Sequence, residues 1–306
     1  MNKKIVSAAV VMLVVCMAFP VVLGETDETD VWVPQTGAKP SVSYTPHAPI
    51  RINSDADFVV GSNGVVSGTG TVADPFIIEG WNISANATSP VIIGNNTVHF
   101  IIRNCKFIGD IATPSEIMSI FLMNVNNMRF EQNILGLSKV SVYLNTGTDV
   151  VFTNNTFWIS GKVHIFLGSV NYARITNNTF FGSVGYAVMA SSCNYARVYY
   201  NNFTSNAGGG TPGAKQASDD YSTTDIWNES DKGNYWSDWT GPDSDGDGIV
   251  DAPYQLDGSY TRNDYKPIAG PSIVYEAPLA AILLMIVAIT ISASCRCSFR
   301  RKTTRK

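Results

Sequence analysis

Residues 174–180 read RITNNTF, and residues 197–203 repeat this phrase as RVYYNNF. Earlier versions are IIEGWNI at 77–83, IIRNCKF at 101–107, RFEQNIL at 129–135 and VFTNNTF at 151–157. We call the last apolar residue of each phrase its anchor. Successive anchors are 24, 28, 22, 23 and 23 residues apart, from Ile83 through Phe107, Leu135, Phe157 and Phe180 to Phe203. A period in the low twenties with one β-type phrase per repeat is typical of a solenoid, in which each repeat forms one coil.

Each phrase has the pattern of a β-strand. Apolar residues flank polar ones in it, as Ile175 and Phe180 do in RITNNTF, and this region has no long 3.6-residue period. A coil of about 22 residues is too short for a strand–helix–strand unit, which needs roughly 30 residues. The strands of successive coils must therefore stack about 4.8 Å apart, as in a parallel β-helix. We predict this β-helix over residues 50–218.

Asparagine recurs at two positions before the anchor. Asn tolerates left-handed backbone and bonds its own chain, so these pairs predict a tight bend between strands and ladders of stacked amides. We expect Cys105 and Cys193 to be buried thiols, four coils apart and too distant for a disulfide. The residues two before the anchor are Cys105, Asn133, Asn155, Asn178 and Asn201, and those three before it are Asn104, Gln132, Asn154, Asn177 and Tyr200.

The two ends of the chain predict an exported protein held in a membrane. Two lysines precede an apolar run, so we interpret residues 1–24 as a signal peptide, with an uncleaved anchor as the alternative, and residues 25–49 as a flexible leader. Residues 277–295 are apolar enough to span a membrane once, and the basic tail at 296–306 favours the cytoplasmic side. The domain between these ends is then extracellular. Its seven N-x-S/T sequons predict a glycoprotein.

The charge distribution disfavours a nucleic-acid partner. The formal net charge of −4 becomes −12 without the two basic residues of the signal and the six of the tail, because 13 basic and 25 acidic residues remain. An acidic extracellular domain repels nucleic acid. Twelve of the acids lie between Asp219 and Asp264 and form a block that needs its own explanation.

Part of this acidic block, GPDSDGDGIVDAPY at 241–254, has the spacing of a calcium-binding loop. Acids at loop positions 1, 3, 5 and 9 and a glycine at position 6 let oxygens surround a hard cation, and a backbone carbonyl serves as position 7. Position 12 is Tyr254, so an EF-hand helix pair is not expected, and a plain acidic turn is the alternative. The spacing resembles the calcium loops of thrombospondin type 3 repeats and dockerins. The predicted Ca²⁺ ligands are Asp243, Asp245, Asp247, the carbonyl of Ile249, and Asp251.

An aromatic stretch, IWNESDKGNYWSDW at 226–239, precedes the acidic loop. Aromatic clusters bind sugars, but they also cover the open edge of a terminal coil. We therefore predict that residues 219–270 form an aromatic and acidic cap on the last coil, which the Ca²⁺ would stabilise.

Taken together, these motifs resemble a known family. The opening GTGTVADPFIIEGWNI at 68–83, the asparagine turns, and the closing GNYWSDW and DSDGDGIVDAPY are similar to archaeal surface proteins with a NosD-type domain, over roughly residues 50–268. The resemblance implies an all-β fold, a right-handed parallel β-helix of the carbohydrate-binding and sugar-hydrolase type. Proteins of this family are often named periplasmic copper-binding proteins, after an accessory protein of nitrous oxide reductase.

Two functions implied by the resemblance find little support in the residues. Copper needs imidazole or soft sulfur ligands that converge, and the histidines and methionines share no ligand spacing. Polysaccharide cleavage needs paired carboxylates on one face, and we find no two acids of the coils in one phase of the repeat. The residues considered for copper are His47, His99, His164, Met118, Met123, Met128 and Met189, and those for cleavage are Glu79, Asp110, Glu116, Glu131 and Asp149.

Arginine and tyrosine, in contrast, recur in phase. Arg129, Arg174 and Arg197 each stand six residues before an anchor, and Tyr172 and Tyr195 stand eight before. On one sheet they would form a stripe that binds an acidic glycan of the envelope, although a strand face kept soluble by arginine is the alternative. We expect a non-catalytic, membrane-anchored surface protein with a glycan-binding, adhesive or structural role. A polysaccharide lyase or hydrolase is the first alternative, and a copper-related accessory protein is the second.

Overall fold

The computed structural model describes residues 43–84, 89–111, 118–207 and 215–271. The chain divides into two units, residues 1–41 and Val42–Lys306, and only the second contains described residues. The predicted signal peptide, most of the leader, the membrane segment at 277–295 and the basic tail lie outside the described residues. Among the residues that are described, no helix has both the length and the apolar character needed to cross a membrane.

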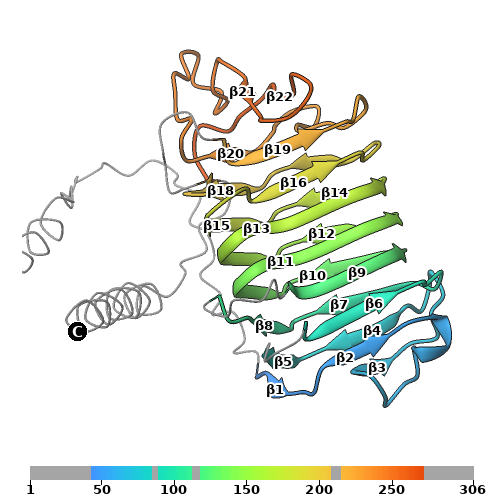
Figure 1. Cartoon of the computed structure of the whole chain (residues 1–306). Helices are drawn as coiled ribbons and strands as arrows, with labels where there is room; N and C mark the ends of the chain where they lie inside the picture. Colours follow the sequence, from blue (N-terminus) through green and yellow to red (C-terminus); the bar gives the residue numbers. More distant parts are fainter. Residues whose placement is uncertain (1–42, 85–88, 112–117, 208–214, 272–306) are drawn as a thin grey trace, which may run out of the picture. The chain divides into compact units, whose positions relative to one another are not determined.

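The strands form three columns, to which each complete coil contributes in turn, and we call these columns the first, second and third faces (Figure 1). The first face contains β1 (Thr45–Pro46), β5 (Trp81–Ser84), β8 (Lys106–Ile108), the start of β11 (Ile134–Thr148) and of β13 (Thr156–Asn171), β15 (Thr179–Ser183), β18 (Asn202–Thr204) and β20 (Tyr235–Trp236). The second contains β2 (Ile50–Ile52), β6 (Val91–Gly94), β9 (Met118–Asn126), the ends of β11 and β13, β16 (Val188–Ser191) and β19 (Ala217–Asp220). The third contains β3 (Val65–Ser67), β4 (Phe76–Glu79), β7 (Phe100–Arg103), β10 (Met128–Glu131), β12 (Val151–Thr153), β14 (Arg174–Thr176) and β17 (Arg197–Tyr199).

Strand pairing follows the sequence repeat. The long strands β11 and β13 pair in parallel from Ile134 opposite Thr156 to Thr148 opposite Asn171, with one irregularity after Ser138. Among the described strands, antiparallel pairing is confined to β3 with β4 and to β21 (Tyr254–Gln255) with β22 (Asn263–Asp264). A 3-10 helix, η1 (Asp55–Asp57), lies between β2 and β3. The fold is a parallel β-helix, which confirms the predicted all-β solenoid, and its right-handedness stays a prediction.

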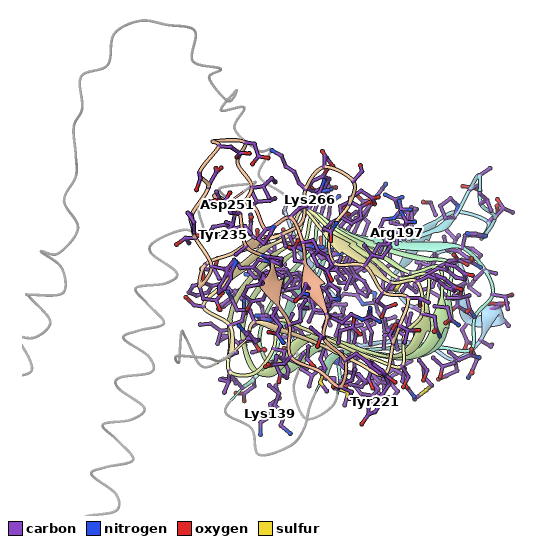
Figure 2. The ribbon with its side chains drawn as sticks, turned by 90° about the horizontal axis from the view of Figure 1, so that it is seen from above. Lys139, Arg197, Tyr221, Tyr235, Asp251 and Lys266 are labelled. Atoms are coloured by element: carbon purple, nitrogen blue, oxygen red, sulfur yellow. The ribbon has the colours of Figure 1, made fainter. Side chains whose placement is uncertain are left out.

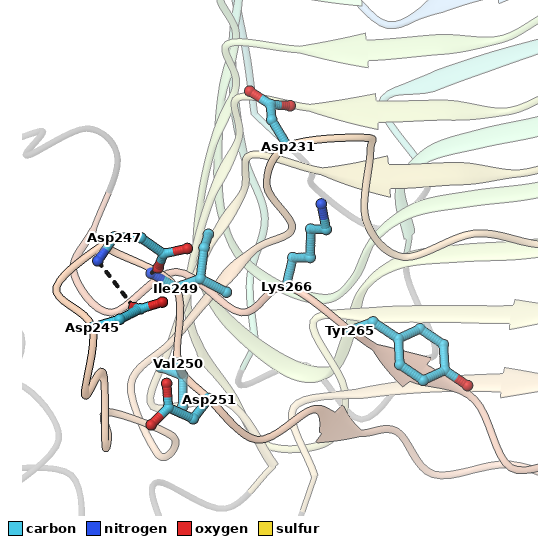
Figure 3. Close-up of a pocket in the computed structure, with 8 residues that line it drawn as sticks. All are labelled: Asp231, Asp245, Asp247, Ile249, Val250, Asp251, Tyr265 and Lys266. Atoms are coloured by element: carbon cyan, nitrogen blue, oxygen red, sulfur yellow. Dashed lines mark hydrogen bonds between the residues drawn. The ribbon is translucent and has the colours of Figure 1, made fainter.

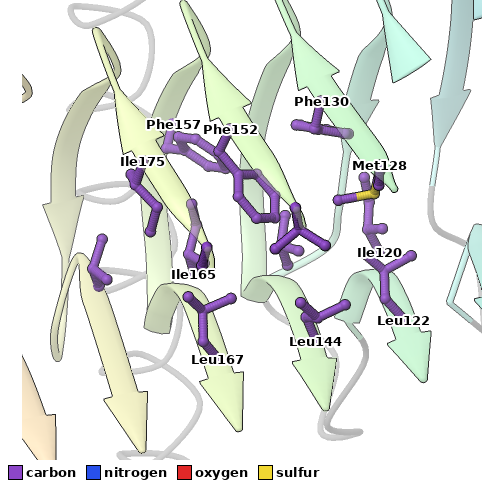
Figure 4. Packing of buried hydrophobic residues seen from close by; sticks show 14 of the residues in the cluster. Ile120, Leu122, Met128, Phe130, Leu144, Phe152, Phe157, Ile165, Leu167 and Ile175 are labelled. Atoms are coloured by element: carbon purple, nitrogen blue, oxygen red, sulfur yellow. The ribbon is translucent and has the colours of Figure 1, made fainter. Parts of the chain in front are cut away.

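The anchors form one buried file along the first face. Phe157, Phe180 and Phe203 lie directly opposite one another in the strand register, and their rings stack with centroids 4.9 and 5.1 Å apart. Trp236 and Tyr254 extend the stack into the cap at 4.2 and 4.0 Å. All five side chains are fully buried, and Figure 4 shows Phe157 among the core side chains between the coils. Stacked aromatic rings and apolar burial therefore hold each coil to the next.

A ladder of buried asparagine side chains runs beside the anchors. Asn178 Oδ1 accepts hydrogen bonds from the backbone N–H and from Nδ2 of Asn155, one coil earlier, both at 2.9 Å. Asn178 Nδ2 donates to the carbonyl of Phe152 at 2.9 Å. Buried polar groups cost free energy unless they have such partners. The ladder confirms the predicted stacking of amides, and its members in the repeat, each at most 1% exposed, are Asn133, Asn155, Asn178 and Asn201.

This ladder continues into the cap and ends on a carboxylate. Asn234, two residues before Trp236, accepts from the backbone N–H of Asn201 at 3.1 Å and from its Nδ2 at 2.9 Å. Asp264 Oδ2 then accepts from the backbone N–H of Asn234 at 2.7 Å and from Trp236 Nε1 at 3.0 Å. A carboxylate only accepts, so it can terminate a chain in which every amide donates in the same direction. Burial raises the pKa of Asp264 to about 6, although these hydrogen bonds favour its charged form.

The residue before each ladder position, which Cys105 occupies in one coil and asparagine in the next four, makes the bend. Its backbone is left-handed in five successive coils, with φ of 49°, 57°, 56°, 57° and 59° at Asn104, Gln132, Asn154, Asn177 and Tyr200. Asn adopts this conformation at lower cost than most residues do. The two asparagines of a phrase thus have different tasks, because the outer one turns the chain and the inner one builds the ladder.

Both cysteines of the β-helix are structural. Cys105 and Cys193 are fully buried and carry free thiols, as predicted. Burial raises the pKa of Cys105 to about 12 and that of Cys193 to about 11. Because the thiolate is the reactive and metal-binding form, neither side chain is suited to redox chemistry or metal binding.

Candidate functional site

Two tyrosines and two arginines lie at the start of the third face, in two successive coils. Arg174 of β14 pairs directly with Arg197 of β17, and Tyr172 and Tyr195 stand in the turns that lead into these strands. The tyrosine rings stack with centroids 5.2 Å apart and 8° between their planes, and their side chains are 56% and 53% exposed. We call these four residues the tyrosine–arginine patch. Figure 2 shows Arg197 at one edge of the molecule, on the side opposite Lys139.

The turn itself does not require tyrosine. Tyr172 and Tyr195 have left-handed backbones with φ of 55° and 58°. In the two preceding coils the same register position holds Asn127 and Asp149, with φ of 57° and 55°. After glycine, Asn and Asp adopt this conformation most readily, whereas a tyrosine there costs backbone strain of order 1 kcal/mol. The exposed ring pair therefore stands at a position where a smaller side chain would fold at least as well.

The arginines of the predicted stripe differ in their partners. Arg129 lies in the same column two coils before Arg174, with Val151 between them, and Arg129 forms an ion pair with Glu131 at 2.9 Å. Arg197 forms one with Glu229 at 3.3 Å. Sequence reasoning missed Glu229 because it belongs to the cap and has no phase in the repeat. Arg174 has no carboxylate partner among the described residues, and it is exposed.

One sequence-based statement about the acids is wrong. Glu79 and Glu131 share a phase of the repeat, since both stand four residues before an anchor, and they lie in one column of the third face with Arg103 between them. Glu79 is bound to Arg103 at 2.8 Å and accepts from Asn104 Nδ2 at 3.0 Å. Burial alone would raise the pKa of Glu79, but these hydrogen bonds outweigh it and lower the pKa. A general acid needs the opposite shift, so this carboxylate pair is poorly suited to glycoside cleavage.

The acidic loop brings three of its predicted ligands together. Carboxylate oxygens of Asp243, Asp245 and Asp247 lie within 4.8 Å of one another. The loop curls tightly because Gly246 and Gly248 have φ of 74° and 83° and donate their backbone N–H groups to Asp243 at 3.0 Å. Such a cluster offers the hard oxygen ligands that Ca²⁺ takes.

The other two predicted ligands are arranged differently. Asp251 accepts a hydrogen bond from Ser244 Oγ at 2.6 Å and is not part of the three-carboxylate group. Ile249 donates its backbone N–H to Asp247 at 2.7 Å. Both residues line a shallow pocket beside the cluster (Figure 3). The pocket is lined by Asp231, Asp245, Asp247, Ile249, Val250, Asp251, Tyr265 and Lys266.

The histidines do not form a metal site. His164 is fully buried, where Nε2 donates to the carbonyl of Phe181 at 3.1 Å and Nδ1 accepts from Ser141 at 3.3 Å, and burial lowers its pKa to about 3. His47 packs on Trp81 with ring centroids 4.5 Å apart. Within the described ranges, the one group of three or more His, Cys, Asp or Glu side chains that could hold a metal is the acidic cluster of the loop. Copper, which prefers imidazole and sulfur, does not fit these oxygens.

Comparison with protein families supports this fold assignment. The sequence profile of a family described as "Periplasmic copper-binding protein (NosD)" matches residues 38–241, which is two thirds of the chain. The chain belongs to the NosD family. Neither the curated proteins nor the solved structures contain a significant match to it.

The NosD match also divides the candidate sites. The tyrosine–arginine patch lies inside the matched region. The acidic loop begins at Asp243, after the matched region ends. The family match therefore covers the patch and does not cover the loop.

Proposed function

We propose that this NosD-family protein binds glycans at the cell surface without cleaving them and is anchored there by residues 277–295. The tyrosine–arginine patch is the observation that carries the proposal. Exposed tyrosine rings pack on the apolar faces of sugars, and arginines donate charge-assisted hydrogen bonds to acidic groups. The two rings are exposed and stacked in a turn that Asn127 and Asp149 make in the preceding coils, which supports a ligand as the reason for them. An adhesive role would use the same surface.

The carboxylates favour binding over cleavage. The two glutamates of the third face are each bound to an arginine, and the pKa of Glu79 is lowered. Copper binding, which the family description names, is likewise not supported by the described residues. In the described part of the chain, His47, His99 and His164 form no group of three or more ligands that could hold a metal, and the buried thiols have raised pKa values. We therefore place neither a hydrolase nor a copper site on these coils.

A glycan array with the full chain in detergent tests the proposal. We expect binding to acidic glycans, and a Tyr172→Ala/Tyr195→Ala double variant should lose at least tenfold in affinity because both stacking surfaces are removed. The matched control is Tyr221→Ala/Tyr260→Ala, which removes two equally exposed rings elsewhere and should leave affinity unchanged. Absence of binding to every glycan, or equal losses in the two double variants, would contradict the proposal.

We further propose that the acidic loop binds one structural Ca²⁺. Asp243, Asp245 and Asp247 repel one another when the loop is empty, and a divalent cation removes this repulsion. Trp239 joins the loop to the aromatic cap, because its Nε1 donates to the carbonyl of Ala252 at 2.8 Å. Binding at the loop would therefore stabilise the end of the β-helix.

Calcium is expected to raise the melting temperature of the protein relative to the same sample in EDTA. At a thousandfold excess of Ca²⁺ over its dissociation constant, binding raises the free energy of unfolding by about 4 kcal/mol. Asp245→Asn should abolish both this shift and the calorimetric binding signal, whereas Asp74→Asn, a change at an exposed residue in the opening loop, should keep both. Superimposable melting curves in Ca²⁺ and EDTA would rule out the site.

A further inference from the structure

We infer that the tyrosine–arginine patch selects glycans whose carboxylates are widely spaced, with Arg174 as the group that binds the carboxylate. This inference rests on the proposed glycan binding and adds to it the charge density of the ligand. Arg129, Arg174 and Arg197 occupy equivalent positions in the repeat, but Arg129 and Arg197 are paired with glutamates and Arg174 has no carboxylate partner among the described residues. The inference follows from this difference.

Two of the three arginines are neutralised within the protein. Glu131 is bonded to Arg129 through both Nε and Nη2, at 3.2 and 2.9 Å. Glu229 lies 3.3 Å from Arg197. A ligand anion brought to either arginine meets a carboxylate already in place, and like charges brought together cost binding free energy.

Arg174 stands between these two ion pairs. Its neighbours in the column are Val151 and Arg197, and no acid pairs with it in the described parts of the chain. Thr176, two residues further along the strand, pairs with Thr153, and both threonines are buried, whereas Arg174 is exposed. Tyr172 is two residues away, at the turn into the same strand. One cationic group with an aromatic ring next to it suits one acidic sugar.

The surroundings of Arg174 limit how many anions a ligand can carry. Coils are about 4.8 Å apart, so Glu131 and Glu229 lie within about 10 Å of Arg174 along the axis. Tyr200 beyond Arg197 donates to Asp231 at 2.6 Å, which adds another carboxylate at that end. A glycan with an acid on every sugar would place its second and third carboxylates next to these acids. A glycan with one acid in two sugars would place uncharged sugars there.

The test measures affinities of the full-length protein for four oligosaccharide probes of equal length at one ionic strength. Hyaluronan carries one carboxylate per two sugars, polygalacturonate carries one per sugar, heparin carries several sulfates and carboxylates per disaccharide, and dextran carries none. We expect hyaluronan to bind tightest. Arg174→Ala should weaken its binding at least tenfold and Arg174→Lys should restore part of the loss, whereas Arg129→Ala should change it less than twofold.

The Glu229→Gln variant provides a second test, because it removes the carboxylate that is paired with Arg197 and keeps the positive charge of Arg197. It should tighten polygalacturonate binding about threefold to tenfold and leave hyaluronan binding within twofold of the wild type. If the wild type binds none of the four probes, the proposed function fails and this inference fails with it. If the wild type binds heparin, polygalacturonate or dextran more tightly than hyaluronan, the inference is overturned while glycan binding stands. The same holds if Arg129→Ala and Arg174→Ala weaken hyaluronan binding equally.

Discussion

Asn178→Ala is expected to lower the free energy of unfolding by about 3–5 kcal/mol. The change removes the acceptor of two hydrogen bonds from Asn155 and the donor of the bond to the Phe152 carbonyl, all in a fully buried site. Each buried polar group left without a hydrogen-bond partner costs about 1–3 kcal/mol, and the smaller alanine side chain leaves a cavity that adds to the loss. Urea unfolding followed by circular dichroism measures the difference.

Asn154→Gln serves as the matched control for the ladder. Asn154 is the exposed, left-handed member of its pair, and the equivalent position one coil earlier is Gln132, with φ of 57°. The longer side chain is thus already accepted in this turn, so the change should stay within about 0.5 kcal/mol. A loss below 1 kcal/mol for Asn178→Ala, or equal losses for the two variants, would mean that the amide ladder does not hold the coils together.

Phe180→Ala should destabilise the protein by a similar amount, about 3–5 kcal/mol. Its fully buried ring stacks between Phe157 and Phe203, so truncation removes apolar burial and leaves a cavity in the middle of the file. The same urea experiment applies. Because the ring contacts both neighbouring coils, the loss should appear in the unfolding of the whole described β-helix.

The chain offers two controls for this aromatic file. Phe181, the next residue, is half-buried and pairs with Trp158 on the outer side, so Phe181→Ala should cost only about 1 kcal/mol. Phe180→Leu should cost about 1–1.5 kcal/mol, since Leu135 fills the equivalent place two coils earlier. If Phe181→Ala were as costly as Phe180→Ala, the assignment of inward and outward faces would be incorrect.

The sequence was sufficient to predict the stacking of the coils. The anchors and the asparagine pairs recur at nearly constant spacing because every coil must return to the same column. There its anchor packs on the anchor of the neighbouring coil, and its asparagine hydrogen-bonds to the neighbouring asparagine. A one-residue slip would turn Phe180 outward and Phe181 inward. Period and phase are thus direct consequences of the register, and both are visible without coordinates.

The end of the ladder was not predicted, for a physical reason. Trp236 pairs with the anchor Phe203 but lies 33 residues after it, and the phrase GNYW has an Asn two residues before Trp236 but no full repeat. Asp264 has no repeat signal at all. It comes from the β21–β22 pair and enters the ladder only because the chain folds back over the last coil.

The candidate sites were predicted in their positions but not in their electrostatics. The phase of the repeat placed Arg174 and Arg197 side by side, and the loop spacing placed Asp243, Asp245 and Asp247 together. Ion pairs such as Arg197–Glu229 join residues from different coils and loops, so no sequence period records them. The bond of Asp251 to Ser244 lies within one loop, but the ligand spacing does not record it either, because that spacing gives no side-chain hydrogen bonds.

The most direct test of the stacked coils is a distance measurement between spin labels introduced as unnatural amino acids at Lys106 and Tyr235. These positions lie in one column of the first face, five coil steps apart through Ile134, Thr156, Thr179 and Asn202. At about 4.8 Å per coil the parallel β-helix predicts a narrow distribution centred near about 24 Å. A broad distribution, or one centred beyond about 40 Å, would contradict it.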